Sequence, residues 1–152
     1  MGSSSDGFGD VSAMVLYQHA ELRARLRDLD MLGGGLTAPP VAAIHLRISV
    51  LRLATLFEAH LQFEERELAP WIRDVDAWGP CREQAMLHEH HEQRLRLQDI
   101  CAMAEASSMD DLGFAHEVSR LLVSILEDMA REERQLSLLG WLYDYGAEQM
   151  TG

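Results

Sequence analysis

A chain of 152 residues, 47% hydrophobic and 25% charged, is long enough for one domain with a substantial core and does not have the composition of a disordered protein. Its formal net charge of −12 argues against a general affinity for nucleic acid or for anionic membrane surfaces. The two cysteines, Cys81 and Cys101, lack a CxxC spacing, so neither a zinc ribbon nor a disulfide framework is expected.

The first ten residues, MGSSSDGFGD, predict a flexible N-terminal tail. They are acidic and rich in Gly and Ser, and they have neither the basic start nor the apolar run of a secretory signal. No stretch of the chain reaches the ~18 consecutive apolar residues that a membrane helix needs. We therefore expect a cytoplasmic protein that does not associate with membranes and whose free thiols suit reducing conditions.

Four stretches of the chain carry apolar residues at spacings of three and four, as on one face of a helix. They are 11–32, 41–73, 82–106 (the least regular) and 112–144. Breaks rich in Gly, Pro or small polar residues separate them, and no stretch alternates with the period of a strand. The pattern predicts an all-α fold, an antiparallel up-down four-helix bundle over residues 11–146, with 147–152 as a C-terminal tail.

Polar side chains interrupt the apolar stripes at positions that the helical period assigns to the interior. They are His19, His60, Glu64, Asp128 and Glu132. A buried carboxylate must be protonated, ion-paired or bound to a metal. His60 and Glu64 are four residues apart, and so are Asp128 and Glu132, so each pair points one way and one ion could take both members. Such ligands converging from facing helices are typical of a pair of iron or manganese ions.

The third helix offers three histidines within the segment HEHHE: His88, His90 and His91. At ~100° per residue, His90 lies closest to the direction shared by the apolar residues of this helix. His91 points about 100° further round and His88 points nearly to the opposite side. His90 is therefore the first candidate ligand, with His91 and His88 in reserve.

Each of these residues also has a structural interpretation without a metal. His19 alone would more often be a core histidine bonded to a backbone carbonyl. Glu64 or Glu132 could be half of a buried ion pair with an arginine, and Asp128 could be a solvated edge residue if its helix is rotated by one position. Acids and histidines buried independently at matched depth in every helix would be a costly coincidence, so we favour a metal site.

With these motifs the chain resembles the hemerythrin/HHE cation-binding domain family, over essentially its whole length. The family has a His on the first helix, HxxxE on the second, a His on the third and HxxxE on the fourth. The matching segments here are His19, HLQFE at 60–64, HEHHE at 88–92 and DMARE at 128–132. The EExxLxP that often follows in the family is EERELAP at 64–70. Asp128 stands where the family usually has His, and the third helix lacks the HxxxH of the oxygen carriers.

The resemblance implies two iron ions, with manganese less expected, bridged by Glu64 and Glu132 and by an oxo or hydroxo group. His19 and His60 would be terminal ligands, and His90 and Asp128 would complete the set. The two halves of the chain would form a pseudo-repeat in which His19 matches His90.

The expected function is then that of a non-haem di-iron protein which binds and reacts with O₂ or another small diatomic molecule or peroxide, in oxygen or redox binding or sensing. A di-iron oxidase or oxygenase acting on a small-molecule substrate is the alternative, which the carboxylate-rich ligand set favours. A metal-free interaction bundle is the second alternative. No P-loop, dinucleotide fingerprint or nucleophile–base–acid set supports a hydrolase or a nucleotide-dependent enzyme.

Overall fold

The computed structural model describes residues 4–34, 40–106 and 110–149, and within these ranges the chain is all-helical, without a strand. The elements in chain order are α1 (Ser4–Gly34), α2 (Pro40–Phe63), the π-helical turn η1 (Glu64–Leu68), α3 (Ala69–Asp74), α4 (Gly79–Glu105) and α5 (Asp111–Gln149). The all-α class predicted from the sequence is confirmed. None of the described helices is long and apolar enough to cross a membrane.

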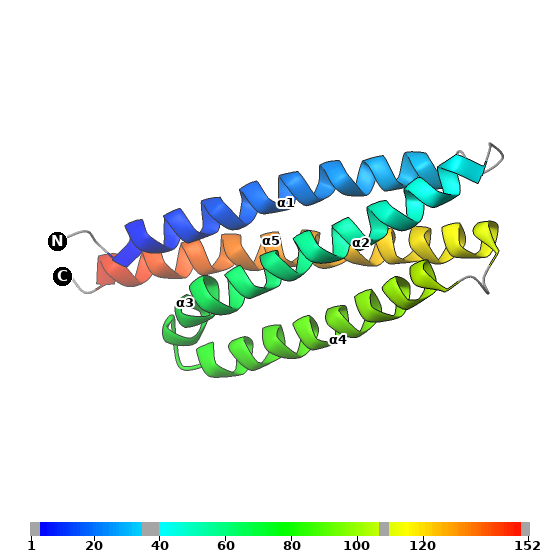
Figure 1. Ribbon diagram of the computed structural model, residues 1–152. Coiled ribbons are helices and arrows are strands. Elements are labelled where there is room, and N and C mark those ends of the chain that lie inside the picture. The colour runs from blue at the N-terminus through cyan, green and yellow to red at the C-terminus, as the bar shows by residue number, and fades with distance from the viewer. Residues whose placement is uncertain (1–3, 35–39, 107–109, 150–152) are drawn as a thin grey trace.

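The helices lie side by side as a bundle, in which α2, η1 and α3 follow one another as a single bent rod (Figure 1). The start of α1, the end of α5 and the short α3 lie at one end of the molecule (Figure 1). The end of α1 and the start of α2 lie at the other end (Figure 1). Helix α1 packs on α2 and α5, and α4 also packs on α2 and α5, so the four rods enclose a common interior.

The described parts of both tails predicted from the sequence are helical. Helix α1 begins at Ser4, and Phe8, which falls in the predicted flexible segment 1–10, is buried. Its ring packs against Trp71 and Tyr143, with centroid separations of 6.2 and 5.0 Å. This burial outweighs the low helix propensity of the Gly/Ser-rich segment. At the other end α5 continues to Gln149, so the predicted tail 147–152 is helical up to that residue, and residues 1–3 and 150–152 lie outside the described ranges.

Local chemistry sets the start of the last two helices. A Cβ on Gly79 would lie 2.0 Å from the carbonyl oxygen of Arg73, so only glycine lets α4 begin this close to the end of α3. Asp110 precedes α5, and its Oδ1 accepts a hydrogen bond of 2.6 Å from the N–H of Gly113. That bond satisfies one of the free donors at the helix start.

The apolar core consists of two clusters separated along the bundle. The larger includes Leu22, Phe57, Leu61 and Met129, and the smaller includes Val15, Leu68, Ile72 and Leu136. In sequence, His19 of α1 lies between Val15 of the smaller cluster and Leu22 of the larger, and Glu132 of α5 lies between Met129 of the larger and Leu136 of the smaller. A buried polar layer therefore divides the core, and its side chains need partners within the layer.

Candidate metal centre

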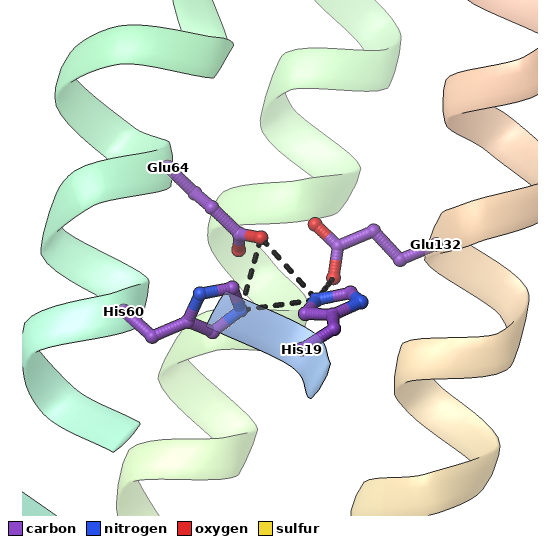
Figure 2. Close-up of side chains that lie close together, drawn as sticks. All are labelled: His19, His60, Glu64 and Glu132. Carbon is purple, nitrogen blue, oxygen red and sulfur yellow. Dashed lines mark hydrogen bonds and ion pairs between the residues drawn. The ribbon is translucent and has the colours of Figure 1, made fainter. Parts of the chain in front are cut away.

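Side chains from all four rods meet in the polar layer. They are His19 of α1, His60 of α2, Glu64 of η1, His90 of α4 and Glu132 of α5. His19 and Glu64 are fully buried, and the side chain of Glu132 is 20% exposed. One ligand atom each from His19, His60, Glu64 and Glu132 lies within 4.8 Å of the others (Figure 2). This buried His/Glu group could hold a metal ion.

Glu64 stands at the centre of the layer, and its two oxygens face different imidazoles. Oε1 lies 3.0 Å from Nε2 of His60 and 3.8 Å from Nε2 of His19 (Figure 2). Oε2 lies 3.2 Å from Nε2 of His90, on the other side of the carboxylate. Glu132 approaches from α5, with its Oε2 3.5 Å from Nε2 of His19. Each oxygen of this buried carboxylate therefore has its own imidazole neighbours.

Several oxygens of this layer are buried without a hydrogen bond from the described part of the chain: Oε1 and Oε2 of Glu64, and Oε1 of Glu132. A buried, unsatisfied carboxylate oxygen is costly, because it has lost its water and gained no donor. These acceptors also lie beside the ring nitrogens, with Nε2 of His19 and Nε2 of His60 only 3.2 Å apart. Electron-pair donors brought this close suit a cation held between them, or protons in its place.

The opposite nitrogen of each imidazole is bonded to an acceptor outside the layer. The Nδ1 partners are Glu133 Oε1 for His19 (2.9 Å), Gln18 Oε1 for His60 (2.8 Å) and Glu65 Oε1 for His90 (3.0 Å). A carboxylate or amide oxygen can only accept here, so each Nδ1 carries the proton and donates. Each Nε2 of the neutral ring is then an electron-pair donor that points into the layer, as a metal-binding histidine requires.

Without a metal ion, protons on the imidazoles and on Glu132 offset the negative charge of the layer, as the directions of the pKa shifts show. Burial disfavours a charged His19, yet the carboxylates around it, above all Glu132 and Glu64, raise its pKa to about 10. The pKa of His90 is also raised against burial, chiefly by Glu64. Burial opposes ionisation of Glu64 too, but the three imidazoles hold its pKa well below the ordinary value. Burial and the charge of Glu64 raise the pKa of Glu132. A divalent ion at these ligands would displace protons.

The π-helical turn aims two consecutive glutamates at the interior. The N–H of Ala69 donates to the carbonyl of Glu64, five residues back, as in a π-helix. Pro70 stands directly after this turn and has no N–H to give to the carbonyl of Arg66, with which its ring would also clash in a regular helix. In the wider turn, Glu64 faces the layer while Glu65 reaches Nδ1 of His90.

Asp128, predicted as a ligand, is not brought into the layer. Its Oδ2 accepts hydrogen bonds from Arg96 at 3.0 Å and from Gln93 Nε2 at 3.1 Å. Its Oδ1 accepts one from Arg131 at 2.5 Å. Two guanidinium groups thus neutralise this carboxylate. The physical reason is that Arg96 of α4 and Arg131 of α5 both lie within hydrogen-bonding distance of the aspartate.

Of the three histidines in the HEHHE segment, His90 faces the layer, while the reserve candidates His88 and His91 are exposed. Sequence reasoning missed the residues that hold the imidazoles, namely Gln18, Glu65 and Glu133. A signal for two of them was present: each interior glutamate is followed by a second glutamate, in EER at 64–66 and again at 132–134.

Comparisons of the chain with protein-family models, with curated proteins and with solved structures gave no match.

Proposed function

We propose that this protein is a hemerythrin-like non-haem di-iron protein, an antiparallel up-down bundle that binds and reacts with O₂ or another small diatomic molecule or peroxide. The observation that carries the proposal is the position of the central carboxylate. Each oxygen of Glu64 faces the Nε2 atom of an imidazole whose Nδ1 is held by a hydrogen bond to another side chain. Carboxylates together with imidazoles from facing helices are a ligand set that suits iron in a bundle.

The layer divides into two adjoining halves. His19, His60 and Oε1 of Glu64 would hold one ion, and His90 with Oε2 of Glu64 would hold the other. Glu132 lies beside His19 and would serve as the second carboxylate. Fewer side chains would hold the second ion, because Asp128 is bound to arginines, and this would leave room for a small exogenous molecule. Bound iron would supply one-electron redox chemistry and affinity for O₂.

The residues themselves have three roles in this proposal. The carboxylates of Glu64 and Glu132 offset the positive charge of the ions in a site with little access to water. The acceptors behind the rings hold a proton on each Nδ1, so that Nε2 is the nitrogen left to bind a metal ion when the ring is neutral. The apolar clusters on both sides of the layer exclude solvent, which limits the loss of a reactive oxygen species to water.

The proposal is tested by metal content and by reaction with O₂. The protein is stripped of metal, loaded anaerobically with Fe²⁺ and analysed for iron, and its absorption spectrum is recorded before and after exposure to air. We expect two irons per chain and new near-ultraviolet and visible absorption upon oxidation. Glu64→Ala should bind no iron and show no spectral change, whereas Glu67→Ala, at an exposed position of the same turn, should behave as wild type. A wild-type chain that stays free of iron, and of Mn²⁺ offered in its place, rules the proposal out.

A second candidate, oxidation of a small-molecule substrate, is favoured by one observation. A hollow of about 570 Å³ between α1 and α5 includes Glu133, the residue that binds Nδ1 of His19, together with Leu136 and Tyr143. A small apolar substrate seated there would lie close to the layer. Adding a candidate substrate to the oxidised protein distinguishes an enzyme from a binding or sensing protein. A binding protein returns to its reduced spectrum only with added reductant, whereas an oxidase also does so when its substrate is supplied.

A further inference from the structure

His19 is held by a chain of contacts that ends in an arginine of its own helix. Its Nδ1 donates to Oε1 of Glu133 at 2.9 Å, and the same oxygen accepts a hydrogen bond of 2.6 Å from Arg23. Arg23 stands one helical turn after His19, so both side chains leave the same face of α1. Glu133 is the residue after Glu132 on α5. We call His19, Glu133 and Arg23 the α1 relay.

His90 is held in the same way on the other side of the layer. Its Nδ1 donates to Oε1 of Glu65 at 3.0 Å, and Arg94, one turn further along α4, donates to both oxygens of Glu65 at 2.6 and 3.2 Å. Arg94 also binds Glu58 on α2, which fixes the guanidinium from a second direction. Glu65 is the residue after Glu64. We call His90, Glu65 and Arg94 the α4 relay.

The two relays repeat one arrangement on the two sides of the layer, and each joins residues from both halves of the chain. In each, one glutamate faces the layer, and the glutamate that follows it in sequence accepts a hydrogen bond from the histidine of a neighbouring helix. An arginine four residues after that histidine donates to this second glutamate. His60 has no such chain, since its Nδ1 partner is the neutral amide oxygen of Gln18. A charged acceptor held by a cation orients a ring more strongly than a neutral amide does.

We propose that the outer pairs Glu133–Arg23 and Glu65–Arg94 are positioning residues, each of which sets the affinity of the ion held by its own histidine. This rests on the proposed function, because it assumes an ion on either side of Glu64. The arginine holds the carboxylate of the glutamate in place. The glutamate accepts the hydrogen bond from Nδ1, which orients the ring with Nε2 toward the ion, and its negative charge makes that nitrogen a more basic donor.

The test uses Co²⁺ as the probe, because its absorption bands report each ion as it binds. Metal-free protein is titrated anaerobically, and wild type should take two ions. Glu133→Gln keeps the size and an acceptor oxygen but loses the charge, and it should weaken the ion held by His19 by about 10- to 100-fold. Glu65→Gln should weaken the ion held by His90 by a similar factor and leave the first ion within about twofold of wild type.

Matched controls place the same substitution on the same elements. Glu127→Gln on α5 and Glu67→Gln on η1 change exposed glutamates that touch none of the three imidazoles in the described chain, and they should leave both affinities unchanged. Arg23→Lys keeps the positive charge beside Glu133 and should recover most of the affinity that Arg23→Met loses. Thermal unfolding of the metal-free variants shows whether the fold is intact.

A role in folding alone would not act on one histidine at a time, so ring signals assigned to each histidine provide the decisive measurement. Long-range ¹H–¹⁵N NMR spectra of the Zn²⁺-loaded protein should show the proton on Nδ1 of His19 and His90 in wild type. The His19 signals alone should change in Glu133→Gln, and the His90 signals alone in Glu65→Gln. If wild type binds Co²⁺ and both variants bind both ions as wild type does, the relay proposal is overturned by itself. If wild type binds no Co²⁺, the proposed function fails together with it.

Discussion

The two halves of the polar layer solve the same electrostatic problem in different ways. On the side of α1 and α2, His19 and His60 both turn Nε2 toward Oε1 of Glu64. On the side of α4 and α5, His90 turns Nε2 toward Oε2 of Glu64, and Asp128, which would correspond to His60 in the predicted pseudo-repeat, is paired with arginines. The comparison shows that helical register brings a side chain near the interior, but its nearest counter-charge decides whether it reaches the layer.

The largest effect should come from substituting His60, and the contrast with Asp128 is tested by substituting each residue separately. His60→Gln removes a nitrogen ligand from the first half, and we expect it to weaken the first Co²⁺ by about 100- to 1000-fold. Asp128→Asn should leave both affinities within about threefold, since this side chain is paired with Arg96 and Arg131 outside the layer, and should cost about 1 kcal/mol of unfolding free energy through its weakened arginine contacts. Co²⁺ titration and urea unfolding measure the two effects. A large loss of metal in Asp128→Asn would mean that the aspartate swings into the layer when an ion binds.

The sequence predicts the positions of some side chains of this layer and not of others. Periodicity places His19, His60 and Glu64 in the interior, where they lie, and the angular position of His90 separates it from its neighbours. Asp128 shares the same spacing, but periodicity contains no information on which arginines a neighbouring helix will present. Pairing across helices is a tertiary property.

The supporting residues show a second limit. Glu65 and Glu133 each stand one residue beyond the interior stripe, where a regular helix points about 100° away from the residue before. They reach the imidazoles because glutamate is long and, for Glu65, because the π-turn changes the local register. The helical tail at Ser4–Asp10 escaped prediction for a related reason, since Phe8 packs there against Trp71 and Tyr143, which are distant in sequence.

The second-largest effect is on the pH dependence of stability, which should differ between protein that holds protons in the layer and protein that holds a metal ion there. The groups that face His19 are His60, Glu64, Glu132, Glu133 and, through Glu133, Arg23. Because the pKa of His19 is raised from 6.5 to about 10 by folding, its contribution to stability is full below pH 6.5 and is lost as the pH rises through about 10. The raised pKa of Glu132 acts in the same direction.

Metal-free protein should therefore lose roughly 2–3 kcal/mol of unfolding free energy between about pH 6.5 and 9, by urea unfolding in the presence of a chelator. The Zn²⁺-loaded protein should show the opposite trend, because protons compete with the ion for the imidazoles below neutral pH. His19→Gln should flatten the metal-free profile, and His91→Gln, at an exposed position, should not. Parallel profiles with and without Zn²⁺ would show that the ion does not bind in this layer.

The smallest effect concerns the π-turn, which the first glutamate pair has and the second lacks. Pro70→Ala restores the N–H that a regular helix would use, a gain of about 1 kcal/mol. Closing the turn would, however, rotate the buried Leu68 and Ile72 away from the smaller apolar cluster, at a cost of about 2 kcal/mol for each side chain. Packing therefore outweighs the recovered hydrogen bond, and we expect Pro70→Ala to keep the turn, with Co²⁺ affinities within about threefold of wild type. If the ion held by His90 alone were weakened tenfold or more, the proline rather than the core would be what keeps Glu65 within reach of that imidazole.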